Sequence, residues 1–488
     1  MRKLLLLSLL SGVSWAQAQL APSVQNYVKV DAPTVVLAHV RVIDGTGAAP
    51  REDQSIVISG GKIQSVSAAS AKPSAEAKVL DFSGYSVIPG LVGMHDHLFY
   101  PAGSGLFHEM GHSFPRLYLA AGVTTIRTGG SIEPYTDLEL KKAIDAGKIP
   151  GPKMHVTGPY LEGAGSFAVQ LYQLSGPDEA RKTVDFWADR GVTSFKAYNF
   201  VTRAELGAAI QAAHQRGLKV TGHLCSIGFR EAADLGIDNL EHGLLVDTEF
   251  YKEKKPDQCP SPQLAMADLT RLEVTGPEIQ GLIRYLVQKK VAITSTLPVF
   301  EQFVPGRPAP QPRVLDAMAA DARNDYLANR LRRHDPKLAA QGYGTPTSPW
   351  PALFQKEMQF EREFVKAGGL LMAGEDPTGI GGTLAGFGDQ RGVELLVEAG
   401  FTPLEAIKIA TLNGAQYLGE ADRIGSIAPG KQADLVVIKG DPSKDINDIE
   451  KVEIVFKDGV GYDSEKLIQS VRDWWGLGSK IRLAPRAC

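Results

Sequence analysis

The sequence is poor in cysteine: its 488 residues include only Cys225, Cys259 and Cys488. Three cysteines cannot form the framework of several disulfides that holds small secreted domains together. A chain of this length does not need one, because it can bury a large core in one catalytic domain and a smaller accessory domain. Cys259 and Cys488 are one pair to consider, although the sequence does not show how far apart they lie.

Long apolar runs and an excess of one charge are also missing. Beyond the N-terminal segment, no stretch is long and apolar enough to predict a membrane helix. The formal net charge is −3, with acidic and basic residues mixed along the chain. Nothing therefore predicts a groove for nucleic acid, and we expect neither a nucleic acid nor a membrane as partner of the mature chain.

The first 18 residues have the pattern of a secretory signal peptide. Arg2 and Lys3 precede an apolar run from Leu4 to Leu10, and Ala16-Gln17-Ala18 forms a small-residue cleavage site. The run is too short to span a bilayer comfortably, which disfavours the alternative of a retained membrane anchor. We predict a mature chain that begins near Gln19, in the periplasm or outside the cell.

Two regions near the ends of the chain are rich in β-branched residues and turns. They are residues 19–85 and 421–465, the second followed by a tail over 466–488. Strands at both ends of a chain are compatible with a single small β-sandwich built from both termini. We therefore predict such a composite accessory domain.

Between these regions, short β-rich runs alternate with helical stretches from residue 86 to residue 420. Eight strands can be counted, from Val87–Met94 to Leu370–Gly374, which is the number that a (β/α)8 barrel needs. The alternative is a doubly wound open sheet, which the alternation alone does not separate from a barrel. Residues 300–351 break the rhythm with many prolines and no clear strand, and they predict a helical, lid-like insertion. A smaller insertion covers residues 247–262.

Two histidines follow the first apolar run of the predicted barrel, in Pro-Gly-Leu-Val-Gly-Met-His95-Asp-His97. Alternate residues of a strand point to the same side, so both imidazoles can face one metal ion. Imidazole nitrogen suits zinc and other divalent metals. A His-x-His pair alone is weak evidence, but this pair lies at the C-terminal end of a strand, where barrel active sites form.

Further candidate ligands end other predicted strands. They are Lys196 on the fourth, His223 on the fifth, His242 on the sixth and Asp376 on the eighth. Each alone has an ordinary structural explanation, such as a solvated charge, a hydrogen-bonded core residue or a turn former. Their placement at successive strand ends favours one shared site, because catalytic groups of barrels collect at that face.

These motifs resemble the amidohydrolase superfamily over nearly the whole mature chain, and most closely its imidazolonepropionase-like group, which includes Xaa-Pro dipeptidases. The segment Gly425-Ser-Ile-Ala-Pro-Gly-Lys-Gln-Ala-Asp-Leu-Val-Val resembles that family's return into its β-sandwich. The resemblance implies two divalent metal ions, with zinc expected. It assigns His95 and His97 to one ion, His223 and His242 to the other, a carboxylated Lys196 between them, and Asp376 to the first. It also implies a homo-oligomer.

The chemistry of these residue types agrees with hydrolysis. A lysine ammonium is a poor metal ligand, whereas a carbamate has two oxygens that can bridge two cations. Two cations make a bridging hydroxide available near neutral pH and polarise a carbonyl. Asp376 can pass a proton to the leaving amine, and Tyr198 can donate to the oxyanion, although a packed tyrosine explains it as well. Glu375 departs from the family pattern, and its role is open.

A second metal motif, His108-Glu-Met-Gly-His112, matches the zincin pattern, which requires both histidines on one helix face. Gly111 and Pro115 disfavour a helix there. The segment follows the first strand, where a loop that lines the substrate site belongs. We expect His108 or His112 to contact substrate rather than to bind catalytic metal.

The leading hypothesis is hydrolysis of an amide or peptide bond in a small peptide or an N-acyl amino acid. One alternative is a one-metal deaminase or cyclic-amide hydrolase, which would not need a carbamate at Lys196. Another is a non-catalytic extracytoplasmic binding protein, which would not need every ligand. Barrel loops set specificity, and the sequence of these loops does not identify the substrate.

Overall fold

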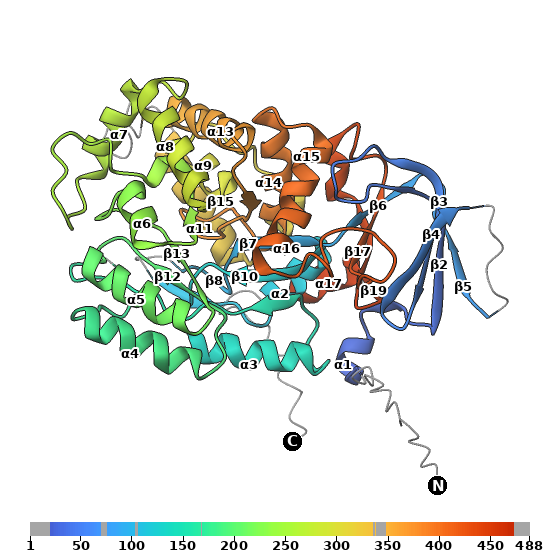
Figure 1. Cartoon of the computed structure of the whole chain (residues 1–488). Helices are drawn as coiled ribbons and strands as arrows, with labels where there is room; N and C mark the ends of the chain where they lie inside the picture. The colour runs from blue at the N-terminus through green and yellow to red at the C-terminus, as the bar shows by residue number, and fades with distance from the viewer. Residues whose placement is uncertain are drawn as a thin grey trace, which may run out of the picture.

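Two parallel β-sheets and one larger, mostly antiparallel sheet organise the chain (Figure 1). The computed structural model describes residues 20–69, 76–102, 106–166, 168–334, 337 and 348–472. The predicted signal peptide and most of the C-terminal tail lie outside these residues. No described helix has the length and apolar character needed to cross a membrane.

The parallel strands follow one another in space in the order in which they occur in the chain. One sheet has the order β11-β10-β7 and the other β12-β13-β14-β15-β16. Their bounds are β7 Leu91–Asp96, β10 Val123–Thr128, β11 Lys153–His155, β12 Ser194–Ala197, β13 Lys219–Gly222, β14 Asn239–Glu241, β15 Ala292–Ser295 and β16 Leu371–Ala373. This order differs from that of a doubly wound sheet, which reverses direction at a switch point.

Backbone contacts connect the two parallel sheets at both junctions. A parallel bridge joins Thr157 to Ser194, and the Asp376 N–H donates to the His95 carbonyl at 3.0 Å. Gly374 allows this second approach, because a Cβ there would lie 2.5 Å from the His95 nitrogen. The strands are assigned to two sheets, and their closure into one barrel stays a prediction.

The larger sheet contains strands from both ends of the chain, in the order β1-β19-β18-β17-β6-β2-β3-β4, with β5 beside β2. Their bounds are β1 Val28–Val30, β2 Thr34–Val42, β3 Arg51–Ser59, β4 Lys62–Ala68, β5 Lys78–Asp81, β6 Tyr85–Pro89, β17 Leu435–Lys439, β18 Val452–Lys457 and β19 Val460–Asp463. β17 pairs with β6, which brings the terminal segments together. Its arrangement as a two-layered sandwich stays a prediction, as do the domain boundaries.

The predicted strand Val87–Met94 is two strands in the structure, which corrects the sequence-based assignment. β6 ends at Pro89 in the larger sheet and β7 begins at Leu91 in a parallel sheet. Gly90 lies between these two strands, where the chain passes from one sheet to the other. A Cβ at this position would lie 2.0 Å from the Thr124 hydroxyl oxygen. Continuous apolar character does not reveal such a switch, because both strands are buried on both faces.

Helices follow most of the parallel strands. Their bounds are α1 Pro22–Gln25, α2 Phe114–Ala120, α3 Pro134–Asp145, α4 Pro177–Ala188, α5 Arg203–Gln215, α6 Phe229–Leu235, α7 Pro262–Arg271, α8 Pro277–Lys289, α9 Leu297–Glu301, α10 Pro312–Ala317, α11 Ala320–His334, α13 Trp350–Lys366, α14 Phe387–Glu398, α15 Pro403–Lys408, α16 Gly414–Leu418 and α17 Ser464–Arg472. Thr402 and Glu405 form a capping box before α15, as their spacing leads one to expect. The predicted insertion over residues 300–351 includes α10 and α11.

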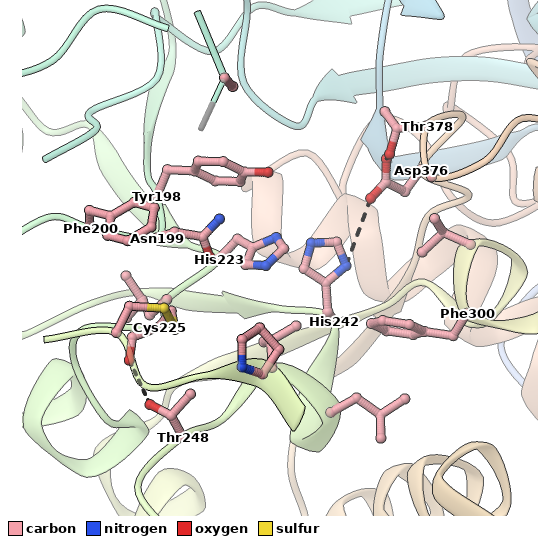
Figure 2. Close-up of a pocket in the computed structure, with 18 of the residues that line it drawn as sticks. Tyr198, Asn199, Phe200, His223, Cys225, His242, Thr248, Phe300, Asp376 and Thr378 are labelled. Atoms are coloured by element: carbon pink, nitrogen blue, oxygen red, sulfur yellow. Dashed lines mark hydrogen bonds and ion pairs between the residues drawn. A yellow bond between two sulfur atoms is a disulfide. The ribbon is translucent and has the colours of Figure 1, made fainter. Parts of the chain in front are cut away.

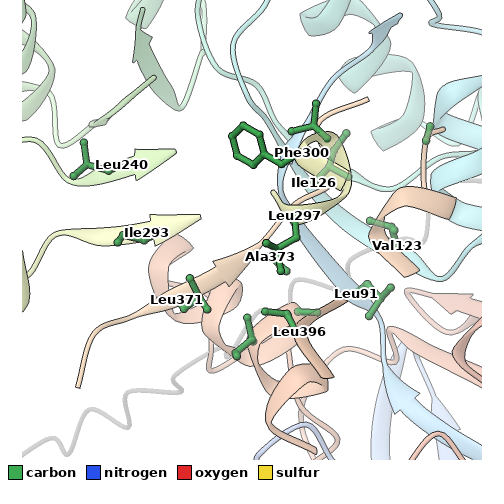
Figure 3. Close-up of a cluster of buried hydrophobic side chains, with 14 of the residues drawn as sticks. Leu91, Val123, Ile126, Leu240, Ile293, Leu297, Phe300, Leu371, Ala373 and Leu396 are labelled. Carbon is green, nitrogen blue, oxygen red and sulfur yellow. The ribbon is translucent and has the colours of Figure 1, made fainter. Parts of the chain in front are cut away.

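Side chains alternate across the parallel strands. Leu240 and Ile293 pack into the hydrophobic cluster that Figure 3 shows, together with Leu297 of α9 and Leu396 of α14. The neighbouring residues on the same strands are polar and buried, for example Asn239 and Thr294. Period-two alternation therefore separates an apolar layer under the helices from a polar interior.

Arg127 of β10 is the centre of that polar interior and is only 1 % exposed. Its guanidinium donates to the Met94 carbonyl, to Asn239 Oδ1 at 2.8 Å and to Glu241 Oε1 at 2.6 Å. One cation thus connects strands β7, β10 and β14. A buried charge is tolerated when it is paired and hydrogen-bonded, as it is here.

We predict that Arg127→Met destabilises the fold by about 3–5 kcal/mol, because it leaves the Glu241 carboxylate buried without its main countercharge. The measurement is the free energy of unfolding from urea denaturation. Arg181→Met is the control, since Arg181 forms an exposed helix-surface pair with Asp178 whose loss costs about 0.5 kcal/mol. Equal effects of the two substitutions would contradict a structural role for the buried cation.

Candidate metal centre

The six residues predicted as metal ligands converge at the C-terminal ends of the parallel strands. They are His95 and His97 on and after β7, Lys196 on β12, His223 after β13, His242 after β14 and Asp376 after β16. His95, His97, Lys196 and His242 are at most 2 % exposed. Strands far apart in the sequence thus bring these side chains into one buried cluster.

Asp376 lies between three of the histidines. Its Oδ2 is 3.5 Å from His95 Nε2 and 3.9 Å from His242 Nδ1, and its Oδ1 is 3.5 Å from His97 Nε2. Ligand atoms of His95, His242 and Asp376 all lie within 4.8 Å of one another. A divalent cation among them would therefore be within coordinating reach of several ligands.

Both ring nitrogens of His95 have a polar side chain within hydrogen-bonding distance. Its Nδ1 is 2.7 Å from Glu241 Oε2, and its Nε2 is 3.0 Å from Lys196 Nζ. A carboxylate at Nδ1 favours the tautomer with Nδ1 protonated, which leaves Nε2 free to bind a metal. Glu241 is in turn oriented by Arg127 and by the Thr221 hydroxyl.

His223 and His242 lie beside each other, with ring centroids 4.4 Å apart (Figure 2). Tyr198 packs against the other side of His223, with centroids 4.9 Å apart. His242 Nδ1 is 2.7 Å from the Thr296 hydroxyl, whereas its Nε2 is buried and has no hydrogen-bond partner among the described residues. An imidazole nitrogen in this state fits a metal ligand better than a structural group.

The backbone is strained at two of these positions. His242 has φ of 70° and Asp376 has φ of 52°, a left-handed conformation that residues other than glycine rarely adopt. Such conformations persist where the surrounding structure enforces them, and they cluster at functional sites. The strain supports a functional role for both residues.

Burial sets the protonation states of the cluster. Desolvation first, and then the Lys196 charge, lower the pKa of His97 well below its usual value, and they lower that of His223 to about 3. Burial lowers the pKa of Lys196 to about 8 and raises that of Asp376 to about 6. The histidines are therefore neutral at pH 7, the form that binds metals, and part of Lys196 is a neutral amine.

The imidazoles of His95 and His242 and the carboxylate of Asp376 lie close enough together to fit a divalent transition metal such as zinc, which nitrogen and oxygen ligands hold. The unpartnered Nε2 of His242 and the Nε2 of His95, which faces Lys196 Nζ at 3.0 Å, agree with this donor set. The residues present therefore fit a metal site.

A cavity of about 800 Å³ opens onto this cluster. His97, Lys196, His223, His242 and Asp376 all line it, and so do Tyr198 and Asn199. Figure 2 shows Tyr198 and Phe300 at opposite sides of the two histidines. A small organic molecule could thus reach the candidate metal centre.

A disulfide joins Cys225 to Cys259, with Cα atoms 4.9 Å apart. The considered pair of Cys259 with Cys488 is therefore wrong, and Cys488 itself lies outside the described residues. The bond ties the insertion over residues 247–262 to the segment after β13, two residues beyond His223, and both cysteines line the cavity. The two cysteines are 34 positions apart in the sequence, and this spacing does not predict that the fold brings them together.

The zincin-like segment forms a strand rather than a helix. β9, Phe107–Glu109, pairs antiparallel with β8, Phe99–Pro101, so the helix face that the motif requires is absent from this segment. His108 and His112 are both exposed, and neither lines the cavity, whereas Phe107 does. Substrate contact by His108 or His112 therefore has no support from their placement.

Glu375 belongs to a separate buried group. Its carboxylate oxygens and those of Asp96 and Asp389 lie within 4.8 Å of one another, and Glu375 Oε2 accepts the Asp389 N–H at 3.1 Å. Burial and mutual repulsion raise the pKa of Glu375 and Asp96 well above their usual values, and burial raises that of Asp389 to about 7. Some of these carboxyl groups therefore carry protons at neutral pH.

Sequence reasoning missed Arg127 and Glu241, the residues that orient His95. Glu241 directly precedes His242 in Asn-Leu-Glu-His, and a charged residue inside an apolar strand was an available signal. Its partner could not be inferred, because Arg127 lies 114 positions away.

Comparison with known proteins agrees with this geometry. A sequence model of the amidohydrolase family matches residues 86–460. An imidazolonepropionase of Porphyromonas gingivalis is 58 % identical over 40 residues, 8 % of this chain and 10 % of that protein. An adenine deaminase of Ligilactobacillus salivarius is 47 % identical over 47 residues, 10 % and 8 % of the two chains. This chain thus matches only about a tenth of the length of these relatives.

A solved structure described as a Xaa-Pro dipeptidase with bound methionine has the same fold. It superposes with a TM-score of 0.65 and 20 % identity, over 88 % of this chain and all of that one. At this identity the likeness shows the fold alone, and within that fold the buried His95, His242 and Asp376 could hold a metal ion. This chain belongs to the amidohydrolase family, as its motifs predicted, and it is a hydrolase that acts on carbon–nitrogen bonds.

We predict that Glu241→Gln weakens zinc binding about 10- to 100-fold, because a neutral amide orients the His95 imidazole less well than a carboxylate does. Competition with a chromophoric chelator measures the affinity. Glu249→Gln is the matched control, since Glu249 binds Arg230 instead of a candidate ligand. Unchanged zinc affinity in Glu241→Gln would show that Glu241 does not position His95.

Metal uptake by the metal-free protein should weaken as the pH falls through about 6. The pKa of Asp376 is raised to about 6, so its carboxylate is ionised above that pH and protonated below it. A metal must then displace this proton, and affinity should fall about tenfold per pH unit. Zinc titrations between pH 5 and 8 measure the effect. Asp376→Asn should lack the break near pH 6; a break retained in that variant would assign it to another group.

Proposed function

We propose that the chain is a binuclear metal-dependent amidohydrolase that cleaves an amide or peptide bond of a small molecule. The observation that carries this proposal is the placement of Lys196 and Asp376 among four histidines, three of which line one cavity. Two divalent ions, with zinc expected, would supply an activated water and polarise the scissile carbonyl. His95 and His97 would hold one ion, His223 and His242 the other, and Asp376 the first.

Lys196 suits carboxylation. Because its pKa is lowered to about 8, a neutral amine is available whose lone pair can attack carbon dioxide. A nitrogen–carbon bond forms, one carbon–oxygen π pair moves onto oxygen, and the nitrogen loses a proton. The resulting carbamate replaces a cation by an anion with two donor oxygens, which favours holding two cations near His95 and His242.

Asp376 and Tyr198 supply the proton chemistry. The Asp376 carboxylate, ionised above pH about 6, can take a proton from the attacking water and give it to the leaving amine. Burial raises the pKa of Tyr198, which keeps its hydroxyl protonated and able to donate to the developing oxyanion.

The surrounding architecture and compartment also belong to this proposal. The sequential strand order supports a complete (β/α)8 barrel, and the pairing of β17 with β6 supports the composite β-sandwich. The Cys225–Cys259 disulfide supports export to the periplasm or the cell exterior, where disulfides persist. A one-metal deaminase is the alternative, and the position of Lys196 beside His95 favours the two-metal site.

We predict that Lys196→Ala lowers bound zinc from two ions per chain to at most one and lowers kcat more than about 100-fold, because the bridging carboxylate is lost. Lys196→Glu should recover part of both losses, since it restores a carboxylate. Elemental analysis and hydrolysis of a panel of N-acyl amino acids, dipeptides and their amides measure the outcome.

Lys182→Ala, on the exposed side of α4, is the control for these variants. One tightly bound ion in the unmodified protein, unaffected by Lys196→Ala, would favour the one-metal alternative. Full turnover by Asp376→Asn would remove Asp376 from the proton transfer.

A further inference from the structure

Aromatic side chains flank the candidate metal centre on two sides. Phe99 lies 4.4 Å from His97 between ring centroids, and Phe107 lies 5.3 Å from Phe99. On the side of His242, Phe300 lies at 5.7 Å, in the position that Figure 2 shows. Asp376 lies between His97 and His242. A scissile bond at the metal centre would therefore have an aromatic cluster on each side.

The cluster beside His242 extends away from the metal centre. Trp350 of α13 stacks on Phe303 at 4.7 Å and on Phe300 at 6.1 Å, with interplanar angles of 21° and 24°. All three residues line the cavity. Their flat, parallel arrangement offers apolar area for a planar or bulky group.

Positive charge is scarce in the cavity wall. Among the described residues that line it there is no arginine and no lysine except Lys196. Lys196 belongs to the proposed metal centre, and carboxylation would make it an anion. The undescribed segments between residues 100 and 350 contain no lysine or arginine in their sequence either. A carboxylate remote from the metal centre would find no such countercharge in the wall.

Among the described residues, Lys254 and Arg333 adjoin cavity-lining groups without lining the cavity themselves, and Arg230 lies near Asp247 but pairs with Glu249. Lys254 donates to the carbonyls of Cys225, Ser226 and Gln258, at 2.8 to 3.3 Å. Arg333 lies over the Phe303 ring, 5.3 Å from its centroid. Lys254 is thus already engaged with backbone oxygens, and Arg333 with an aromatic face.

Asp247 adds a polar group to the cavity wall but no positive charge. It lines the cavity, is 4 % exposed, and its Oδ2 has no hydrogen-bond partner among the described residues. Its Oδ1 accepts from the N–H groups of Glu249 and Phe229. Burial and the neighbouring Glu249 charge raise the pKa of Asp247 well above its usual value. The carboxyl group is therefore neutral near pH 7 and can hydrogen-bond an amide, but it supplies no countercharge for a carboxylate.

We propose that the substrate is an uncharged amide that carries an apolar or aromatic group on each side of the scissile bond. This substrate class rests on the proposed amide hydrolysis and excludes free dipeptides and N-acyl amino acids as preferred substrates. Burying a carboxylate without a countercharge is costly, whereas a carboxamide of the same shape loses little on entering an apolar cavity. The aromatic clusters gain contact area only from bulky groups.

A matched pair of compounds tests the charge requirement. N-phenylacetyl-L-phenylalaninamide and N-phenylacetyl-L-phenylalanine differ at one terminal group, and release of phenylacetate by the zinc-loaded protein measures turnover of both. We expect kcat/KM for the amide to exceed that for the acid at least tenfold. It should exceed that for N-acetylglycinamide, which lacks the apolar groups, by a similar factor.

Variants of Trp350 test the aromatic cluster. Trp350→Ala should lower the ratio of kcat/KM between N-phenylacetyl-L-phenylalaninamide and N-acetylglycinamide at least fivefold, because it removes the stacked surface. Trp350→Phe keeps an aromatic ring and should retain most of that ratio. An unchanged ratio in Trp350→Ala would overturn the assignment of this cluster to substrate.

Binding is measured separately from turnover, by calorimetry with the zinc-loaded Asp376→Asn variant. Tighter binding of the amide together with its faster hydrolysis supports both proposals. Hydrolysis that favours the acid overturns the substrate class and leaves amide hydrolysis standing. Preferential binding of the amide, with no amide hydrolysed by the unmodified protein, supports the cavity's selectivity and overturns the hydrolytic function. Failure of both compounds to bind overturns the substrate class.

Discussion

The carboxylate of Glu241 holds the centre of this protein together. One oxygen accepts from the Arg127 guanidinium and the other faces His95 Nδ1. A buried carboxylate, a buried guanidinium and a buried imidazole would each be costly alone, and each becomes tolerable through the others. The same contacts join strands β7, β10 and β14 and fix the ring that faces Asp376. Stability of the interior and orientation of the candidate ligands therefore depend on one network.

Chemistry and recognition are divided between different parts of the molecule. The candidate ligands lie at strand ends, where the backbone is held by the parallel sheets, which suits groups that need fixed geometry. The walls that select a substrate come from connecting segments, including Phe107 of β9, the disulfide-linked insertion over residues 247–262, and Trp350. A loop tied by Cys225–Cys259 keeps its shape without a large core of its own. Because the cavity wall contains little positive charge, the proposed selection of substrate depends on the shape of the substrate and on its lack of charge.

Much of the strand pattern could be predicted from the sequence. The strand β10 has the sequence Val-Thr-Thr-Ile-Arg-Thr, and β-branched residues in such short runs favour strands. The Thr402 capping box was equally local, since its partners are three residues apart. The change of sheet at Gly90 was missed, because an apolar run has the same composition whichever sheet it joins. The predicted family was confirmed, since its motifs are contiguous in the chain.

The sequence by itself determined which residues could carry the chemistry: histidines, Lys196 and Asp376 at the ends of predicted strands. It also indicated where loops would interrupt the alternation. Only the tertiary structure decided that Glu241 and Arg127 support His95, that Cys259 pairs with Cys225, and that Phe107 rather than His108 lines the cavity. The physical reason is distance along the chain. Strand and cap formation depend on neighbours a few residues apart, whereas these contacts join segments that meet only after the whole chain has packed.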